Sequence, residues 1–147
     1  MTTLIGLFVL SAGFVSCSKD DDDSSSNNAV SSNDLIGTWV IVEEIYKTTV
    51  NGVIEGQERN TYTVAEQENK ITFKANGIFE NEDDDIGTWK LNGTTLTVTY
   101  SNYDYDETDI MQVLQLTSTT LVVEATIIET IEGVKYEEYL KYTFKKI

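Results

Sequence analysis

The sequence has no histidine and no proline, one cysteine, and only 10 Lys and Arg residues against 25 Asp and Glu residues among its 147. Without histidine, the chain has no imidazole metal ligand, no Ser-His or Cys-His nucleophile pair and no side chain that ordinarily titrates near neutral pH. One cysteine cannot form an internal disulfide or a four-cysteine zinc site. The formal net charge of −15 repels phosphate backbones and anionic head groups. We therefore expect no nucleic-acid partner and no electrostatic docking to a membrane.

The composition indicates one folded domain. A chain of this length is normally a single domain, and 40% hydrophobic with 10% aromatic residues is enough to bury a core, unlike the composition of a disordered acidic chain. We expect a monomer that is not an enzyme and that has no cofactor, catalytic or metal site. No spacing singles out a catalytic pair among the 25 acids, and the chain has no histidine to act as a base.

The first segment, residues 1–16, reads MTTLIGLFVLSAGFVS and carries no charged side chain. It is too short for a stop-transfer helix, and the only cysteine, Cys17, follows it directly. This arrangement resembles the signal peptide of bacterial lipoproteins, in which cleavage leaves a lipidated cysteine as the mature N-terminus. The resemblance implies acyl chains such as palmitate on Cys17, which would hold the protein on a membrane. The alternative is a buried N-terminal helix or strand with an unmodified cysteine.

The next segment, residues 17–33, continues after Cys17 as SKDDDDSSSNNAVSSN. Its polar composition and lack of periodicity are typical of a flexible tether. Lys19 followed by Asp20 to Asp23 resembles the acidic export signal of Gram-negative lipoproteins that reach the cell surface. The resemblance implies an outer-membrane lipoprotein of the cell envelope, exposed on the cell surface. The alternative is a common low-complexity linker.

Residues 34–147 read as short β-rich runs separated by turn signals, without a helical stripe longer than a turn or two. Dipeptides suited to tight hairpin turns of type I′ occur at Asn76-Gly77 and Asn92-Gly93, and Ser118-Thr119 and Glu132-Gly133 separate two further pairs of runs. The expected strands are Gly37 to Lys47, Thr61 to Val64, Lys70 to Lys74, Ile78 to Glu82, Gly87 to Leu91, Thr95 to Tyr100, Ile110 to Leu116, Leu121 to Glu129 and Lys135 to Phe144.

The spacing of these runs predicts an all-β fold, an antiparallel up-and-down meander of about eight strands. An open sheet of that size would leave two exposed edges, and closure into a barrel removes them. Residues 95–100 alternate threonines with Leu, Val and Tyr, which gives the expected barrel an inner and an outer face.

One local motif occurs twice, as Ile36-Gly37-Thr38-Trp39 and as Ile86-Gly87-Thr88-Trp89. We expect each glycine to allow a close backbone approach and each tryptophan to plug the barrel. The opening Leu35-x-Gly37-x-Trp39 resembles that of lipocalins, and the match is closer to the lipocalin-like domains of small bacterial lipoproteins. Later motifs in the same order extend the resemblance to residues 35–147. These motifs are Ile71, Phe73 and Gly77; Gly87 and Trp89; Leu96 and Val98; and Leu114, Leu116, Leu121 and Val123.

The resemblance implies a barrel that binds one small hydrophobic molecule. Glu138 and Tyr142 share a strand face with other aromatic residues, and Gln112 shares one with Ile110 and Leu114. If these faces line the interior, Gln112, Glu138 and Tyr142 are candidate cavity-lining residues. The alternative for Gln112 and Glu138 is a bulge or a position near the open rim.

Two other functions stay open. An acidic surface suits a non-enzymatic interaction protein that docks a cationic partner. Tyr100, Tyr103 and Tyr105 could stack on sugars in a glycan-binding accessory. The acidic runs at 81–85 and 104–109 suggest calcium binding, because calcium prefers carboxylate oxygens. Neither run has the spacing of a known calcium loop, and acids that are simply solvated in turns are the commoner case.

Overall fold

The computed structural model describes residues 31–65, 70–82, 86–101 and 107–147. These residues form nine strands, all paired antiparallel, and one short helix, so the prediction of an antiparallel all-β fold is confirmed. No helix in these ranges has the length and hydrophobicity needed to span a membrane. The elements are α1 (Ser32–Leu35), β1 (Gly37–Val50), β2 (Val53–Thr61), β3 (Lys70–Phe73), β4 (Ile78–Asn81), β5 (Ile86–Asn92), β6 (Thr95–Tyr100), β7 (Glu107–Leu116), β8 (Thr120–Ile131) and β9 (Val134–Lys146).

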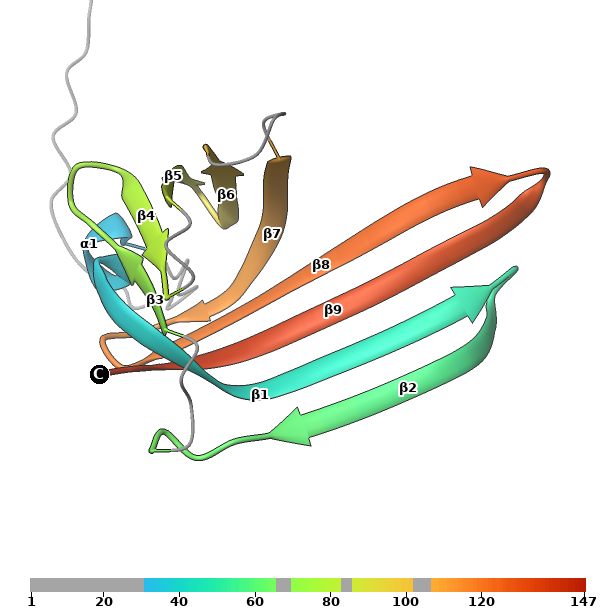
Figure 1. The fold of residues 1–147 in the computed structure, drawn as a ribbon, viewed down its shortest axis with the longest axis horizontal. Coiled ribbons are helices and arrows are strands. Elements are labelled where there is room, and N and C mark those ends of the chain that lie inside the picture. Colours follow the sequence, from blue (N-terminus) through green and yellow to red (C-terminus); the bar gives the residue numbers. More distant parts are fainter. Residues whose placement is uncertain (1–30, 66–69, 83–85, 102–106) are drawn as a thin grey trace, which may run out of the picture.

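Eight of the strands close into a barrel. The sheet order is β2-β1-β3-β4-β5-β6-β7-β8-β9, and β9 also pairs with β1, as the ribbon shows (Figure 1). The expected meander is confirmed from β3 to β9. It is interrupted only by β2, which folds back along the outside of β1 before the chain enters β3. Closure leaves β2 as the one strand outside the barrel within the described ranges.

The sheet continues beyond the barrel as four paired segments, which we call the arm (residues 43–50, 53–61, 125–131 and 134–140). β3 pairs with β1 only over residues 37–40, and β7 pairs with β8 only up to Glu124. Past these points β1 continues with β2 and β9, and β8 continues with β9. Figure 1 shows the arm projecting to one side of the barrel. β3 therefore separates from β1, and β7 separates from β8. These two separations open one end of the barrel.

The second strand differs from the expected one. β2 covers Val53–Thr61 rather than Thr61 to Val64, and it follows a tight turn at Asn51-Gly52, where both residues have positive φ (51° and 82°). Glu132-Gly133 makes the same kind of turn between β8 and β9 (52° and 85°). Positive φ at both central residues is what a type I′ turn requires.

The prediction of type I′ turns at Asn76-Gly77 and Asn92-Gly93 is wrong. At Asn76-Gly77 and Asn92-Gly93 only the glycine has positive φ. The loop from β5 to β6 is Gly93-Thr94, since Asn92 pairs with Thr95. A glycine at the first central position belongs to a type II′ turn.

Polar contacts fasten β2 to β1. The Arg59 Nε donates to Glu43 Oε1 at 2.6 Å, and the same two side chains form an ion pair. The hydrogen bond from Arg59 holds the pKa of Glu43 below its ordinary value, although desolvation opposes this shift. An exposed pair of this kind contributes little stability. β2 is therefore held mainly by its backbone ladder with β1.

The core lies at the closed end of the barrel, beneath the short helix. Trp39 is fully buried, its Nε1 donates to the Leu35 carbonyl at 2.7 Å, and the Lys146 ammonium lies 4.9 Å from the centre of its ring. Trp39 thus plugs the barrel as the repeated motif predicts, whereas Trp89 is only half-buried. The buried core cluster is Leu35, Trp39, Phe73, Phe79, Leu96, Val98, Val113, Leu121, Val123 and Phe144.

Candidate ligand-binding site

A cavity of about 380 Å³ opens at the end of the barrel from which the arm projects. Pockets for small molecules begin at roughly 300 Å³, so this one has room for a ligand of modest size. Apolar and aromatic side chains predominate in its lining. The lining residues are Ile41, Glu44, Tyr62, Ile71, Phe73, Phe79, Val98, Tyr100, Asp109, Met111, Tyr142 and Phe144.

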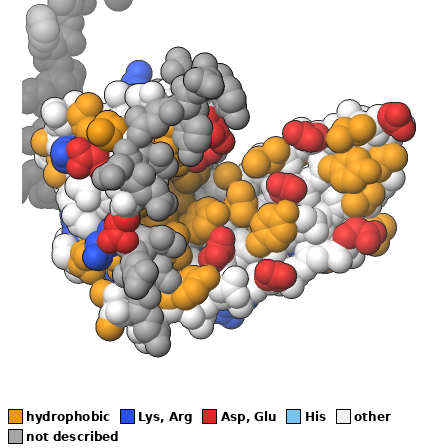
Figure 2. Space-filling model, in the orientation of Figure 1, with side chains coloured by type: hydrophobic (Ala, Val, Ile, Leu, Met, Phe, Trp, Pro, Cys, Tyr) orange, Lys and Arg blue, Asp and Glu red, His pale blue; other side chains and the backbone are white. Residues whose placement is uncertain are grey.

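The parting of β7 from β8 opens the mouth of this cavity. Residues 107–111 of β7 pair only with β6, and residues 125–131 of β8 pair only with β9. A second depression of about 350 Å³ runs along this gap and shares Asp109, Met111 and Tyr142 with the first. Figure 2 shows hydrophobic side chains in the hollow between the barrel and the arm, with acidic side chains among them. The two depressions together form one hollow that continues onto the arm.

Aromatic rings make the floor of the cavity. The Phe73 and Phe79 centroids lie 5.6 Å apart, and Phe79 meets Tyr100 edge-on at 5.5 Å. Tyr142 lies 6.1 Å from Phe144 on β9. These separations are within the favourable range for aromatic pairs. Period-2 alternation explains the arrangement, because positions two apart on a strand face the same side of the sheet.

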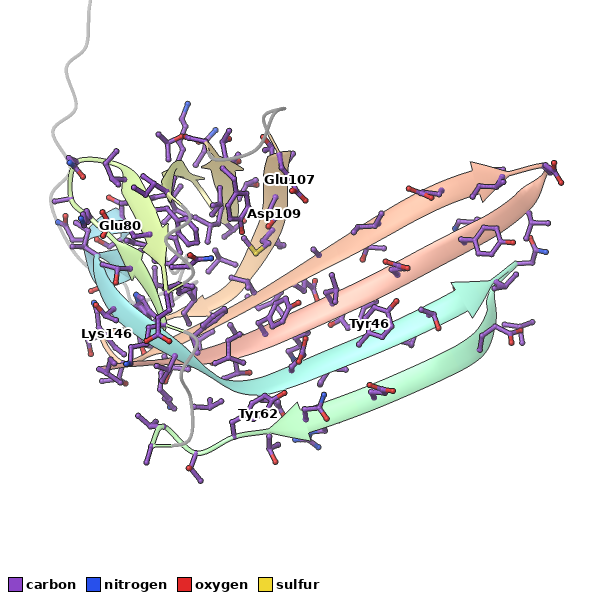
Figure 3. All side chains as sticks on the ribbon, in the orientation of Figure 1. Tyr46, Tyr62, Glu80, Glu107, Asp109 and Lys146 are labelled. Carbon is purple, nitrogen blue, oxygen red and sulfur yellow. The ribbon has the colours of Figure 1, made fainter. Side chains whose placement is uncertain are left out.

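Two carboxylates stand at the mouth, each beside a tyrosine. The Tyr100 hydroxyl donates to Asp109 Oδ2 at 3.0 Å, and the Tyr62 hydroxyl makes a long hydrogen bond of 3.5 Å to Glu44 Oε2. Figure 3 shows Asp109 on β7 and Tyr62 just beyond β2, on opposite sides of the opening. Burial raises the pKa of the Tyr142 phenol, and the charges of Glu44 and Asp109 raise it further. Both carboxylates therefore act on the same half-buried ring.

The three residues predicted to line a cavity occupy different places. Tyr142 lies in the cavity wall. Glu138 is on the same face of β9 but lies out on the arm, where it borders a small depression with Ile127 and Tyr136 and hydrogen-bonds to Tyr46. Gln112 is exposed, and its side-chain amide donates to the Thr94 hydroxyl. The structure thus brings only Tyr142 into the cavity.

A β-bulge explains the position of Gln112. The register of β7 against β8 shifts between Val113 and Gln115, and such a shift reverses which alternate residues face inward. Before the bulge, Met111 and Val113 face the interior, and Ile110 is 64% exposed. After it, Leu116 packs against the core. Alternation read straight through the strand places Gln112 on the inner face, whereas a bulge, the alternative that the sequence left open, places it outside.

Sequence reasoning missed the polar groups of the mouth. Asp109 was grouped with an acidic loop, but it belongs to β7 and points toward the cavity. Glu44 follows a second bulge, where the pairing of β1 with β9 shifts between Ile41 and Glu43. In the sequence, two adjacent acids on a strand give no sign of which one faces inward. The only usable signal for Glu44 and Asp109 is that each acid interrupts a strand of mostly apolar residues.

Several sequence predictions concern residues outside the described ranges. These are the signal peptide at 1–16, Cys17 with the tether at 17–33 as far as residue 30, the acids at 83–85, 104 and 106, and Tyr103 and Tyr105. Where side chains are described, no group of three or more Cys, Asp or Glu residues is arranged to hold a metal ion.

Comparison with known proteins gave one match. A family model described as a lipocalin-like domain matches residues 35–123, from the end of α1 into β8. No curated protein and no solved structure matches the chain.

Proposed function

Because this chain belongs to the family of lipocalin-like domains, we propose that its barrel binds a small, largely apolar ligand in the cavity at the mouth. The observation that carries this proposal is the cavity of about 380 Å³, floored by aromatic rings and bordered by few polar groups. Pockets of that size and character are typical of small-molecule sites. The proposed activity is binding without catalysis, since the chain has no histidine.

The binding proposal is tested with the neutral fluorescent probe N-phenyl-1-naphthylamine. We expect the purified full-length protein, carrying Cys17→Ser so that no acyl chain competes, to bind the probe with an increase in fluorescence. Met111→Trp places a large ring in the cavity and should weaken binding by about tenfold, a free-energy change of about 1.4 kcal/mol. The measurement is a fluorescence titration of each variant.

The matched control is Leu114→Trp on the same strand. Leu114 is 48% exposed and does not line the cavity, so this variant adds the same ring on the outer face and should bind like the parent. Binding that is equally strong in Met111→Trp and Leu114→Trp would contradict a site in the cavity. An absence of probe binding by the parent would remove the proposal altogether.

We also propose that Cys17 carries the lipid anchor of an outer-membrane lipoprotein exposed on the cell surface. The support is the uncharged apolar segment before Cys17 and the acidic run after it, together with the resemblance of both to lipoprotein signals. In a Gram-negative host fed labelled palmitate, the parent should incorporate label and fractionate with outer membranes. Cys17→Ser should incorporate none, and Cys17→Ser protein that is labelled as strongly as the parent would disprove the anchor.

A further inference from the structure

Within the described part of the chain, no cationic side chain neutralises the carboxylates at the mouth of the cavity. None of the described residues that line the cavity is Lys or Arg. Among the residues whose positions are described, Glu44 and Asp109 take part in no ion pair, whereas the neighbouring Glu43 pairs with Arg59. A carboxylate has about four acceptor sites. Glu44 accepts hydrogen bonds from Tyr62 and Tyr142, and Asp109 accepts one from Tyr100, so acceptor capacity remains at both.

Glu44 and Asp109 come from different strands and face the same space. Glu44 is on β1 and Asp109 is on β7, and both line the cavity. Both charges add to the effect of desolvation in raising the pKa of Tyr142, which places their fields together at one half-buried ring. A ligand that reaches the mouth therefore meets two negative charges rather than one.

The aromatic residues also favour a positively charged ligand. Tyr62, Tyr100 and Tyr142 lie in the cavity wall with the two acids. Aromatic faces attract cations, by about 0.5–2 kcal/mol depending on desolvation. An anionic head group would be repelled at this position, and repulsion excludes unwanted ligands as effectively as attraction selects the right one.

We propose that the ligand is a cationic amphiphile, whose apolar part lies on the aromatic floor while its ammonium-type group lies between Glu44 and Asp109. This inference rests on the proposed function, because it takes the cavity as the ligand site. It adds the charge of the ligand and the two residues that recognise it. Simple fatty acids and other anionic lipids are excluded as preferred ligands.

The test compares three probes with the same eight-carbon chain: octyltrimethylammonium, octyl glucoside and octyl sulfate. Calorimetric titration of the full-length protein, again carrying Cys17→Ser, should give an affinity for the cation about tenfold above that for the neutral probe, and a lower affinity for the sulfate. Glu44→Gln and Asp109→Asn should each lower the affinity for the cation by about threefold or more. Both changes should lower the affinity for octyl glucoside less than they lower the affinity for the cation.

The matched control is Glu43→Gln, which removes the same charge one residue away. Glu43 pairs with Arg59 and does not line the cavity, so its replacement should leave the preference for the cation unchanged. This control separates recognition at the mouth from the general attraction of cations to a protein of net charge −15.

The possible outcomes separate this inference from the proposed function. Equal affinity for all three probes would overturn the cation preference and leave a binding cavity. A preference that persists in Glu44→Gln and Asp109→Asn would also overturn it, because the general charge would then be the cause. Binding of the cation alone, lost in both variants, would support the inference but contradict the binding of neutral apolar molecules. No binding of any probe would overturn both.

Discussion

Trp39→Ala is expected to lower the free energy of unfolding by about 3–5 kcal/mol, a large part of the roughly 5–15 kcal/mol that stabilises a typical small domain. The ring is fully buried at the closed end of the barrel. Its removal leaves a cavity beneath α1, and it also leaves the Leu35 carbonyl without its 2.7 Å hydrogen bond and Lys146 without its ring contact. Urea unfolding followed by far-ultraviolet circular dichroism measures the loss.

Trp89→Ala is the matched comparison for this prediction. Trp89 occupies the same place in the repeated motif and donates to the Lys74 carbonyl at 2.9 Å, but it is only half-buried. We expect a smaller loss than in Trp39→Ala, because less apolar surface returns to water. Trp39→Phe should fall between the parent and Trp39→Ala. Equal losses for Trp39→Ala and Trp89→Ala would show that the first tryptophan is not the plug of the barrel.

Gly87→Ala is expected to cost about 3 kcal/mol, the upper end of the range for overpacking. A Cβ atom at Gly87 would lie 2.2 Å from the Thr99 carbonyl oxygen and 3.1 Å from the Tyr100 Cα. Both atoms belong to the backbone of β6, the partner strand, so no side-chain rotation relieves the contact. The two strands must separate. The loss is measured by the same urea unfolding.

Two other glycines test whether close backbone approach, rather than a left-handed backbone, is the cause of the loss in Gly87→Ala. At Gly93 no atom lies within 4 Å of the added Cβ, but φ is +60°, so Gly93→Ala measures the left-handed backbone alone and should cost about 1 kcal/mol. At Gly37, the first glycine of the repeated motif, the Cβ would meet the flexible Lys146 side chain, with φ at +137°. If Gly87→Ala costs no more than Gly93→Ala, close approach of the backbones is not the reason for the second glycine.

The strands that face the core were predictable from sequence, and those that face solvent were not. β3 to β6 lie within about one residue of their expected bounds, because one face of each is buried and the alternation is strong. β2 was misplaced because nearly all of its residues are exposed, so no buried face imposes a pattern. Its one reliable signal was Asn51-Gly52, which is a hairpin turn in the structure.

β1 and β8 continue past their expected ends into the arm for a related reason. Their outer halves lie in the arm, where Ile127 and Ile128 are exposed. The alternation on β9 continues past the end of the barrel, and it correctly places Glu138 and Tyr142 on one face. It does not reveal where the barrel ends. That point depends on how far β3 and β7 accompany their partners.

Local chemistry thus determined much about this protein: the all-β class, the hairpin order, the motif with its plugging tryptophan and the family. These features follow from residue preferences and from alternation over a few positions, which act within a strand and its turn. Only the tertiary structure determines which side chains line the mouth of the cavity. Bulges in β1 and β7 select Glu44 and Asp109 as inward-facing residues and turn Gln112 outward. A bulge is set by how a strand pairs with its partner, β9 for β1 and β8 for β7, so no single strand contains the information that places these side chains.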